Sequence, residues 1–232
     1  MPGDRDGLDQ LIAKVDPDRW LATRFIGEAA ARADVIALYA YDHELGRARR
    51  AASNALMAEI RLTWWREVLD QIFAGEAVRL HPTAQALAAA VARHGLPRGP
   101  LEAMIDGRIE ALEFSPLDAD QAVGWADAVQ GSATALAAMI LDPAGPPEVT
   151  AAAGRAWGLA LLARSGQAAA KVIAAPLQAA LAEARVVSRQ LSVRAFPAVL
   201  HVTLARHDLT GRTPSVWRKQ LTLLTASLRG RL

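Results

Sequence analysis

The sequence predicts an all-α protein, a single-domain bundle of about eight to ten helices. Three observations support this fold class. The chain is rich in alanine, which loses no side-chain entropy in a helix, and only 5% of its residues are aromatic. Apolar residues recur with helical spacing in one segment after another. The sequence contains no convincing strand pair, no internal repeat and no long linker.

We expect two helices within residues 16–48 and a third over residues 59–76. Asp16 begins the run DPDR, which supplies an N-cap followed by proline in the first turn. In 59–76, apolar residues spaced i, i+3, i+7 and i+10 form one stripe, and Gly75 is a candidate C-terminal stop. These signals predict helices with one apolar face each.

Further helices are expected over 81–97, 97–114, 119–141 and 148–166. Gly and Pro end the first of these, Ser-Pro ends the second, and Asp118 is a candidate cap for the third. The run DPAGPP then separates the third from the fourth, because its prolines and glycine interrupt any helix.

The C-terminal part is less regular. The stretch 167–191 is poorly patterned, whereas 193–209 and 215–230 are expected as helices. We expect one domain over 1–232, with the basic helices of 183–232 packed on it.

Charge is distributed unevenly along the chain. Residues 1–148 carry 14 basic and 22 acidic residues, a net charge of −8, and residues 149–232 carry 12 and 2, a net charge of +10. The two acids of the second part are Glu183 and Asp208. Such a division predicts either an internal dipole between two halves that face each other or a patch for an anionic partner.

Composition also restricts chemistry and location. The absence of cysteine excludes disulfides, thiolate metal sites, iron–sulfur clusters and a cysteine nucleophile. The N-terminal run is polar and lacks the apolar core of a secretory signal, and the longest apolar runs are too short to span a bilayer. We therefore expect a cytoplasmic protein, with peripheral contact to the inner membrane as an open alternative.

Common catalytic motifs are absent, including phosphate-binding P-loops, dinucleotide fingerprints and zinc-protease helices. The five histidines are scattered, which disfavours a helical metal site. Asp106, Glu110 and Glu113 share one helical face, and we interpret them as a solvated face rather than a metal site.

Several segments resemble the squalene/phytoene synthase superfamily in order and spacing, over about residues 16–175. The resemblance implies the all-α isoprenoid-synthase fold around a central cavity. In the segment 125–141, Trp125, Gly131 and Ser132 stand where the family has a tyrosine and a Gly-Ser pair. The segments are ALYAY (37–41), EIRLTWWREVLDQIFAGE (59–76), HPTAQALAAAVARHGLPRGPLEAMIDGRIEAL (81–112), WADAVQGSATALAAMIL (125–141) and AGRAWGLALLAR (153–164).

The resemblance also implies a chemistry. Enzymes of this fold ionise an allylic diphosphate with Mg²⁺ ions, which prefer oxygen ligands and are held between two aspartate-rich helices. The first such motif, D-D-x-x-D, falls here on residues 46–50, which are Gly, Arg, Ala, Arg and Arg. The family's upstream arginine falls on His43, and the nearby Asp42 and Glu44 leave a helix in different directions.

The second aspartate-rich motif is also missing. The segment after the helix 153–164 reads SGQAAAKVIAAP and holds no acid, and Glu183 and Asp208 are too far apart to form one motif. The degenerate pattern resembles a branch that contains the mitochondrial complex I assembly factor and its bacterial relatives. Its features are seen here as AYDHEL (40–45), IDGRIEAL (105–112) and LLARSGQAAAKV (161–172).

Three functional interpretations compete. The first is a noncatalytic pseudoenzyme that needs no cofactor and acts by binding protein partners, for example in respiratory-complex assembly. The second is an active prenyl-diphosphate synthase, whose Mg²⁺ would have to be held by Asp42, Glu44, Asp106 or Glu110. The third is a subunit that binds acidic protein, lipid headgroups or nucleic acid through its basic C-terminal region. Nucleic acid is disfavoured because few aromatic residues accompany the basic ones.

Two sets of residues are candidates for ligand contacts. Four arginines could replace metals in binding an anionic headgroup. Seven larger side chains could line an apolar cavity for an isoprenoid or lipid chain, against the alternative that they fill an ordinary core. The arginines are Arg47, Arg49, Arg50 and Arg164, and the cavity candidates are Tyr39, Tyr41, Trp64, Trp65, Met104, Met139 and Trp157.

Overall fold

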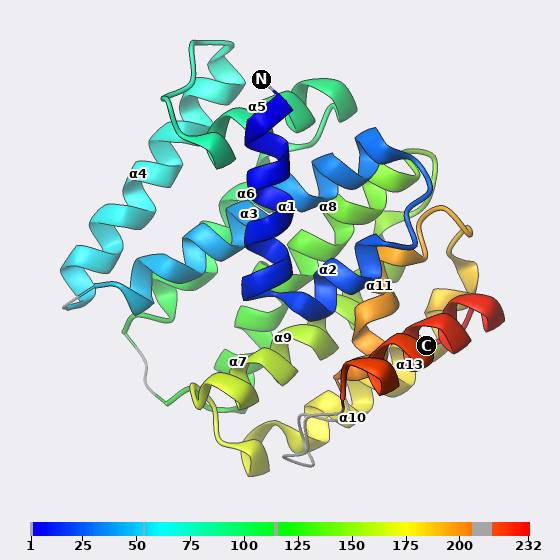
Figure 1. The fold of residues 1–232 in the computed structure, drawn as a ribbon. Helices are drawn as coiled ribbons and strands as arrows, with labels where there is room; N and C mark the ends of the chain where they lie inside the picture. Colours follow the sequence, from blue (N-terminus) through cyan, green and yellow to red (C-terminus); the bar gives the residue numbers. More distant parts are fainter. Residues whose placement is uncertain (1, 53, 114–115, 206–214) are drawn as a thin grey trace.

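The computed structural model describes residues 2–52, 54–113, 116–205 and 215–232, and it confirms the predicted all-α class (Figure 1). The helices of the N-terminal half are α1 (Pro2–Val15), α2 (Pro17–Thr23), α3 (Ala29–Arg50), α4 (Ala55–Ala74), α5 (Pro82–His94) and α6 (Arg98–Glu110). The C-terminal half contains α7 (Ala119–Trp125), the π-helix η1 (Ala126–Gly131), α8 (Ser132–Leu141), the 3-10 helix η2 (Pro147–Thr150), α9 (Ala151–Ser165), α10 (Ala170–Val187), the 3-10 helix η3 (Ser188–Gln190), α11 (Pro197–Leu200), the 3-10 helix η4 (His201–Leu204) and α13 (Val216–Arg229).

The helix ends follow the local signals of the sequence. The Asp16 carboxylate accepts a hydrogen bond from the backbone N–H of Arg19 and caps α2. Asp118 and Gln121 form a reciprocal capping box at the start of α7. Gly75 ends α4 in the left-handed conformation, at φ 71°, which glycine adopts without steric cost.

Three segments differ from the expected pattern. Residues 167–191 contain the helix α10, which buries Ile173, Leu177 and Leu181 on one face and includes Pro176, a residue that normally interrupts a helix. Residues 119–141, expected as one helix, contain a π-helical turn between α7 and α8. Residues 193–209 divide into α11 and η4, and positions 206–209 lie outside the described residues. The described residues therefore contain more helices than the eight to ten expected, because the structure divides some of the expected helices into shorter ones.

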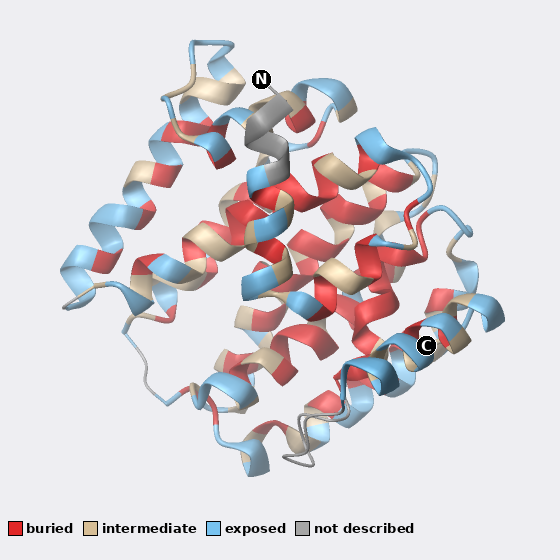
Figure 2. Cartoon of the chain, in the orientation of Figure 1, coloured by how far each residue is buried: buried red, intermediate tan, exposed pale blue. Residues whose placement is uncertain are grey.

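The core consists of two clusters of buried side chains. One cluster is built by α1, α3, α4, α5, α6 and α8, and the other by α2, α7, η1, α9, α10, α11, η4 and α13. Burial is greatest in the central helices, whereas α4 and α13 lie at opposite edges with one side in solvent (Figures 1 and 2). The C-terminal helix α13 packs on η4, α11 and α2. Within the described ranges, no helix is both long and apolar enough to cross a bilayer.

Candidate functional site

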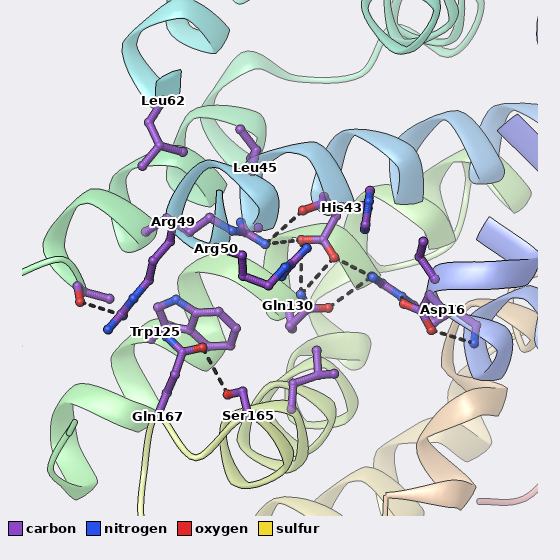
Figure 3. A pocket seen from close by; sticks show the side chains of 17 residues that line it. Asp16, His43, Leu45, Arg49, Arg50, Leu62, Trp125, Gln130, Ser165 and Gln167 are labelled. Atoms are coloured by element: carbon purple, nitrogen blue, oxygen red, sulfur yellow. Dashed lines mark hydrogen bonds and ion pairs between the residues drawn. The ribbon is translucent and has the colours of Figure 1, made fainter. Parts of the chain in front are cut away.

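A pocket of about 850 Å³ lies where the two core clusters meet (Figure 3). The core cluster that includes α3 and α4 contributes Leu45 and Leu62 to the wall of the pocket. Leu161 and Trp125, which pack against the other cluster, form further apolar parts of the wall. The remaining wall is largely polar and mostly basic, so the pocket combines apolar surface with a concentration of charge.

Asp42 on α3 is the buried centre of this polar wall. Its Oδ2 accepts a hydrogen bond from Arg19 Nη2 at 2.5 Å, and its Oδ1 is paired with Arg108. Gln130 Nε2 donates to the same two oxygens at 3.2 and 3.1 Å. Burial alone would raise the pKa of the Asp42 carboxyl, but the two guanidinium groups hold that pKa well below its usual range. Asp42 is therefore an ionised carboxylate with both oxygens engaged.

Arg19 and Arg108 are themselves fixed by further contacts. Arg19 Nε lies 2.5 Å from Asp16 Oδ2, and its guanidinium lies over the Tyr39 ring at 4.5 Å. Burial by itself lowers the pKa of Arg19, but Asp16 and Asp42 raise it above the usual value, so the side chain stays charged. Arg108 donates to the Met104 carbonyl at 2.8 Å. Two carboxylates and two guanidinium groups thus form a network whose charges cancel.

Close helix packing holds Gln130 in this network. Gln130 belongs to the π-helix η1, and π-helical turns often occur at functional sites because they redirect side chains. The neighbouring α9 carries Gly154 and Gly158 where it meets η1. A Cβ on Gly154 would lie 2.7 Å from the Gln130 carbonyl oxygen, and one on Gly158 would lie 2.7 Å from Ala126 Cβ. Only glycine lets the two backbones approach this closely.

Arg49 and Arg50 add uncompensated positive charge to the pocket wall, and His43 lines the same pocket. Arg49 Nη1 donates to the Ala111 carbonyl at 3.1 Å, and among the described residues neither arginine has an ion-pair partner. A Cβ added to Gly46 would lie 2.9 Å from Arg50 Nη1, so the Arg50 side chain lies against Gly46. Burial, and next Arg108, lower the pKa of Arg50. Burial and Arg50 lower the pKa of His43, so His43 is mainly neutral near pH 7.

This arrangement can be compared with known proteins. The family model described as squalene/phytoene synthase matches residues 12–166, which include most of the pocket wall. The chain belongs to the squalene/phytoene synthase family.

Solved structures of family members share the fold. A dehydrosqualene synthase in complex with a ligand has a TM-score of 0.77 at 14% sequence identity, with 98% of this chain and 96% of that chain covered. The squalene synthase HpnC from Alicyclobacillus acidocaldarius has a TM-score of 0.73 at 16% identity, with 94% and 95% covered. No curated protein sequence matches the chain. These likenesses establish the isoprenoid-synthase-like architecture.

The Mg²⁺ ions that the family resemblance implies do not fit this pocket. Asp42 and Asp16 are the acidic residues of its wall, and both are bound to arginine. Arg49 and Arg50 occupy two positions of the first aspartate-rich motif, and α9 contributes Leu161 and Ser165 where the second motif would be approached. A divalent cation would have to displace guanidinium groups inside a cationic wall.

The four acids considered as metal ligands do not come together. Glu44 pairs with Arg47 at 2.9 Å on the surface of α3, and Asp106 pairs with Arg66 at 2.5 Å between α6 and α4. Glu110 lines a separate, smaller pocket beside α7. In the part of the chain that the structure describes, no group of three or more His, Asp or Glu side chains is placed to hold a metal ion.

The four candidate arginines divide between two environments. Arg49 and Arg50 line the pocket as described above, whereas Arg47 is exposed and bound to Glu44. Arg164 lies elsewhere, 3.3 Å from Asp18 Oδ2 and 4.8 Å from the centre of the Trp157 ring. Two of the four are thus brought together at the pocket.

The seven cavity candidates are not part of this pocket wall. Five are buried in the core, and two are partly buried and packed against it. Trp65 is buried while its neighbour Trp64 is only partly so, as expected for adjacent residues on one helix. The buried five are Tyr39, Tyr41, Trp65, Met104 and Trp157, and the partly buried two are Trp64 and Met139.

His201 is a buried polar residue of a different kind. Its ring packs edge-on against Trp157 at 4.7 Å between ring centres and against Tyr39 at 6.5 Å. Neither ring nitrogen has a hydrogen-bond partner among the described residues. Burial, and next Arg19 and Arg164, lower the pKa of His201 well below 6.5, so the ring is neutral at pH 7.

Sequence reasoning missed Asp16, Arg19, Arg108 and Gln130 as site residues. Asp16 and Arg19 were visible only as parts of a helix cap, and Arg108 only as part of the segment IDGRIEAL. Nothing in the local sequence marks Gln130. These residues come from α2, α6 and η1, and only the fold places them around Asp42.

Proposed function

We propose that this family member is a noncatalytic binding protein whose central pocket takes an anionic ligand without a metal ion. The observation that carries the proposal is the Asp42 carboxylate held between Arg19 and Arg108. Asp42 thus pairs with two arginines instead of a metal cation, and the net positive charge of the pocket comes from Arg49 and Arg50, which pair with no carboxylate among the described residues.

The pocket wall suits an amphipathic ligand. Arg49 and Arg50 are available to donate hydrogen bonds to phosphate-like oxygens, since no carboxylate among the described residues pairs with them. Leu45, Leu62 and Leu161 supply apolar contacts in the same pocket. We therefore propose an isoprenoid or other lipid with a phosphate or diphosphate headgroup as the ligand class.

The test is calorimetric titration of farnesyl diphosphate in Mg²⁺ and in excess EDTA, with product analysis of each mixture. We expect equal affinity in both conditions and no release of pyrophosphate. Arg50→Gln should weaken binding about tenfold or more, because a hydrogen bond to a charged group contributes about 1.5–3 kcal/mol. Arg47→Gln is the matched control, since Arg47 lies one turn away on α3 but outside the pocket wall, and we expect its affinity within twofold of wild type.

Two results would contradict the proposal. Binding that requires Mg²⁺ and is followed by pyrophosphate release would establish the alternative, an active prenyl-diphosphate synthase. Equal loss of affinity in the Arg47 and Arg50 variants would remove the pocket arginines as the binding groups.

The biological use of such binding is a further part of the proposal. Participation in respiratory-complex assembly, with a protein partner, follows from the sequence resemblance in AYDHEL and IDGRIEAL and is compatible with a protein that binds and does not catalyse. Affinity purification of the tagged chain tests it: enrichment of complex I subunits is expected, and their absence under conditions that retain known assembly intermediates contradicts it.

A further inference from the structure

We propose that α13 is an attachment surface for an anionic phospholipid bilayer, with a headgroup site in the groove between α13 and α10. This inference concerns the edge of the molecule remote from α4 and is independent of the ligand of the central pocket (Figure 1).

The helix α13 has two apolar faces. Leu223 and Ala226 are buried and pack against the body of the protein. At 3.6 residues per turn, the direction opposite to them is occupied by a second apolar stripe, which lies in an arc of about 60°. This stripe is exposed to solvent: Trp217 is 82% exposed, Leu221 64%, Leu224 47% and Leu228 80%. Figure 2 shows the outward side of α13 as exposed.

An outward stripe of this kind has no role in the packing of the fold. Exposed single leucines are common on protein surfaces, but four large apolar residues aligned over three helical turns mark an interaction surface. An exposed tryptophan at the end of the stripe is typical of helices that lie in a membrane interface, where its amphipathic ring is favoured.

Charge around the stripe has one sign. The helix α13 contains no acidic residue, and Arg218 and Arg229 lie together along one flank of the stripe. Lys219 points the other way and is bound to Asp18 at 2.6 Å. The free positive charge is thus on the solvent side, as in interfacial helices that bind anionic lipids.

A groove of about 690 Å³ lies beside the stripe, between α13 and α10. Leu181, Val202 and Ala226 form its apolar part, and Leu221 belongs both to the groove and to the stripe. Three arginines line it, and no ion pair within the described residues engages them; they are Arg185, Arg229 and Arg231. Guanidinium groups in a groove with an apolar surface match a lipid phosphate and its acyl chains.

A bilayer fits this surface better than a second copy of the chain. Two α13 helices packed stripe to stripe would bring arginines together with no acid on either helix, and like charges repel. The exposed apolar residues of α4 provide a contrast, because Leu56 and Ile60 have neighbours of both charges, the acidic Glu59 and the basic Arg61. Only the α13 surface pairs apolar exposure with an acid-free basic flank, among the helices compared.

The test is co-sedimentation of the full chain with sucrose-loaded vesicles of pure phosphatidylcholine or of phosphatidylcholine with 30% phosphatidylglycerol. We expect binding to the anionic vesicles only, and its reduction in 0.5 M NaCl. Leu221→Ser/Leu228→Ser should lower the partition coefficient more than tenfold, because two exposed leucines no longer enter the interface. Arg229→Gln/Arg231→Gln should lower it about 25-fold, since each arginine near an anionic surface contributes about 1 kcal/mol.

Matched controls are Leu56→Ser/Ile60→Ser on α4 and Arg61→Gln, which change exposed residues at the other edge of the molecule. We expect both to bind as wild type does. Circular dichroism should show unchanged melting for all variants, because the substituted side chains are exposed.

Three outcomes would overturn the proposal. The first is no binding to anionic vesicles, which would remove the bilayer and leave an acidic protein as the occupant to test. The second is equal binding to neutral vesicles, which would remove the role of the arginines. The third is loss of binding in the α4 control with the α13 variants unaffected.

Discussion

Asp42→Asn is expected to destabilise the fold strongly, and the structure gives the size of the effect. The Asp42 side chain is 4% exposed and neutralises Arg19 and Arg108, whose side chains are 5% and 10% exposed. After the substitution Arg19 keeps Asp16, but Arg108 keeps no carboxylate partner, only the backbone carbonyls of Met104 and of residue 42 and the Trp125 ring. Removing one partner of a buried ion pair leaves an uncompensated buried charge and costs about 3–5 kcal/mol, so we expect a loss in that range.

Asp106→Asn is the matched control for this substitution. Asp106 also lies on a helix and contacts an arginine at 2.5 Å, but the two side chains are 56% and 44% exposed. Exposed pairs contribute about 0–1 kcal/mol because water screens them. Arg108→Met should fall between the two, since Asp42 keeps Arg19 and Gln130. Urea unfolding followed by circular dichroism measures all three free energies, with and without Mg²⁺.

Two results would refute the role of Asp42 as a structural anchor. If Asp42 were a metal ligand, its removal would relieve carboxylate repulsion in the metal-free protein and would be neutral or stabilising, and Mg²⁺ would stabilise only the wild type. A loss in Asp42→Asn no larger than in Asp106→Asn, or Mg²⁺-dependent stability that disappears in the Asp42 variant, would show that the arginine-bound carboxylate is not a structural anchor.

Two further predictions concern packing and protonation. Gly154→Ala should destabilise by about 1–3 kcal/mol in urea, because its Cβ would lie 2.6 Å from Gly131 Cα, whereas Gly124→Ala, with nothing within 4 Å, should cost nothing. Below about pH 6.5 His201 is protonated in the unfolded state but stays neutral in the folded state, because burial lowers its pKa. The free energy of unfolding should therefore fall by about 1.4 kcal/mol for each pH unit below 6.5. His201→Phe should remove that component; an unchanged pH profile would contradict it.

Much of the fold could be predicted from the sequence, because its signals are local. Asp16, Gly75 and Asp118 act within a few residues of their own backbone, so their capping roles hold in any tertiary setting. The buried stripe of 59–76 needs only a partner helix. The helix α10 was missed although its buried residues follow helical spacing, and it contains Pro176, a residue that normally interrupts a helix because it lacks the backbone N–H.

The candidate site was predictable only in part. The loss of the first aspartate-rich motif at residues 46–50 is visible in the sequence, and so are Arg49 and Arg50, which stand within it. The sequence offered Asp42 as a weak metal ligand, whereas the structure shows it bound by two arginines from other helices. The pocket wall also excludes the seven aromatic and methionine side chains suggested for it, since they pack within or against the core clusters.

By itself, the sequence determined the helical class, the helix boundaries with strong caps, the absence of both aspartate-rich motifs and the basic character of the C-terminal part. Only the tertiary structure decided which charges meet. Arg19 and Asp42 are 23 residues apart, Asp42 and Gln130 are 88 apart, and their contacts depend on how α2, α3 and η1 cross. The reason is physical: helix formation is driven by neighbours in the chain, whereas a buried ion pair exists only where packing removes water from both partners.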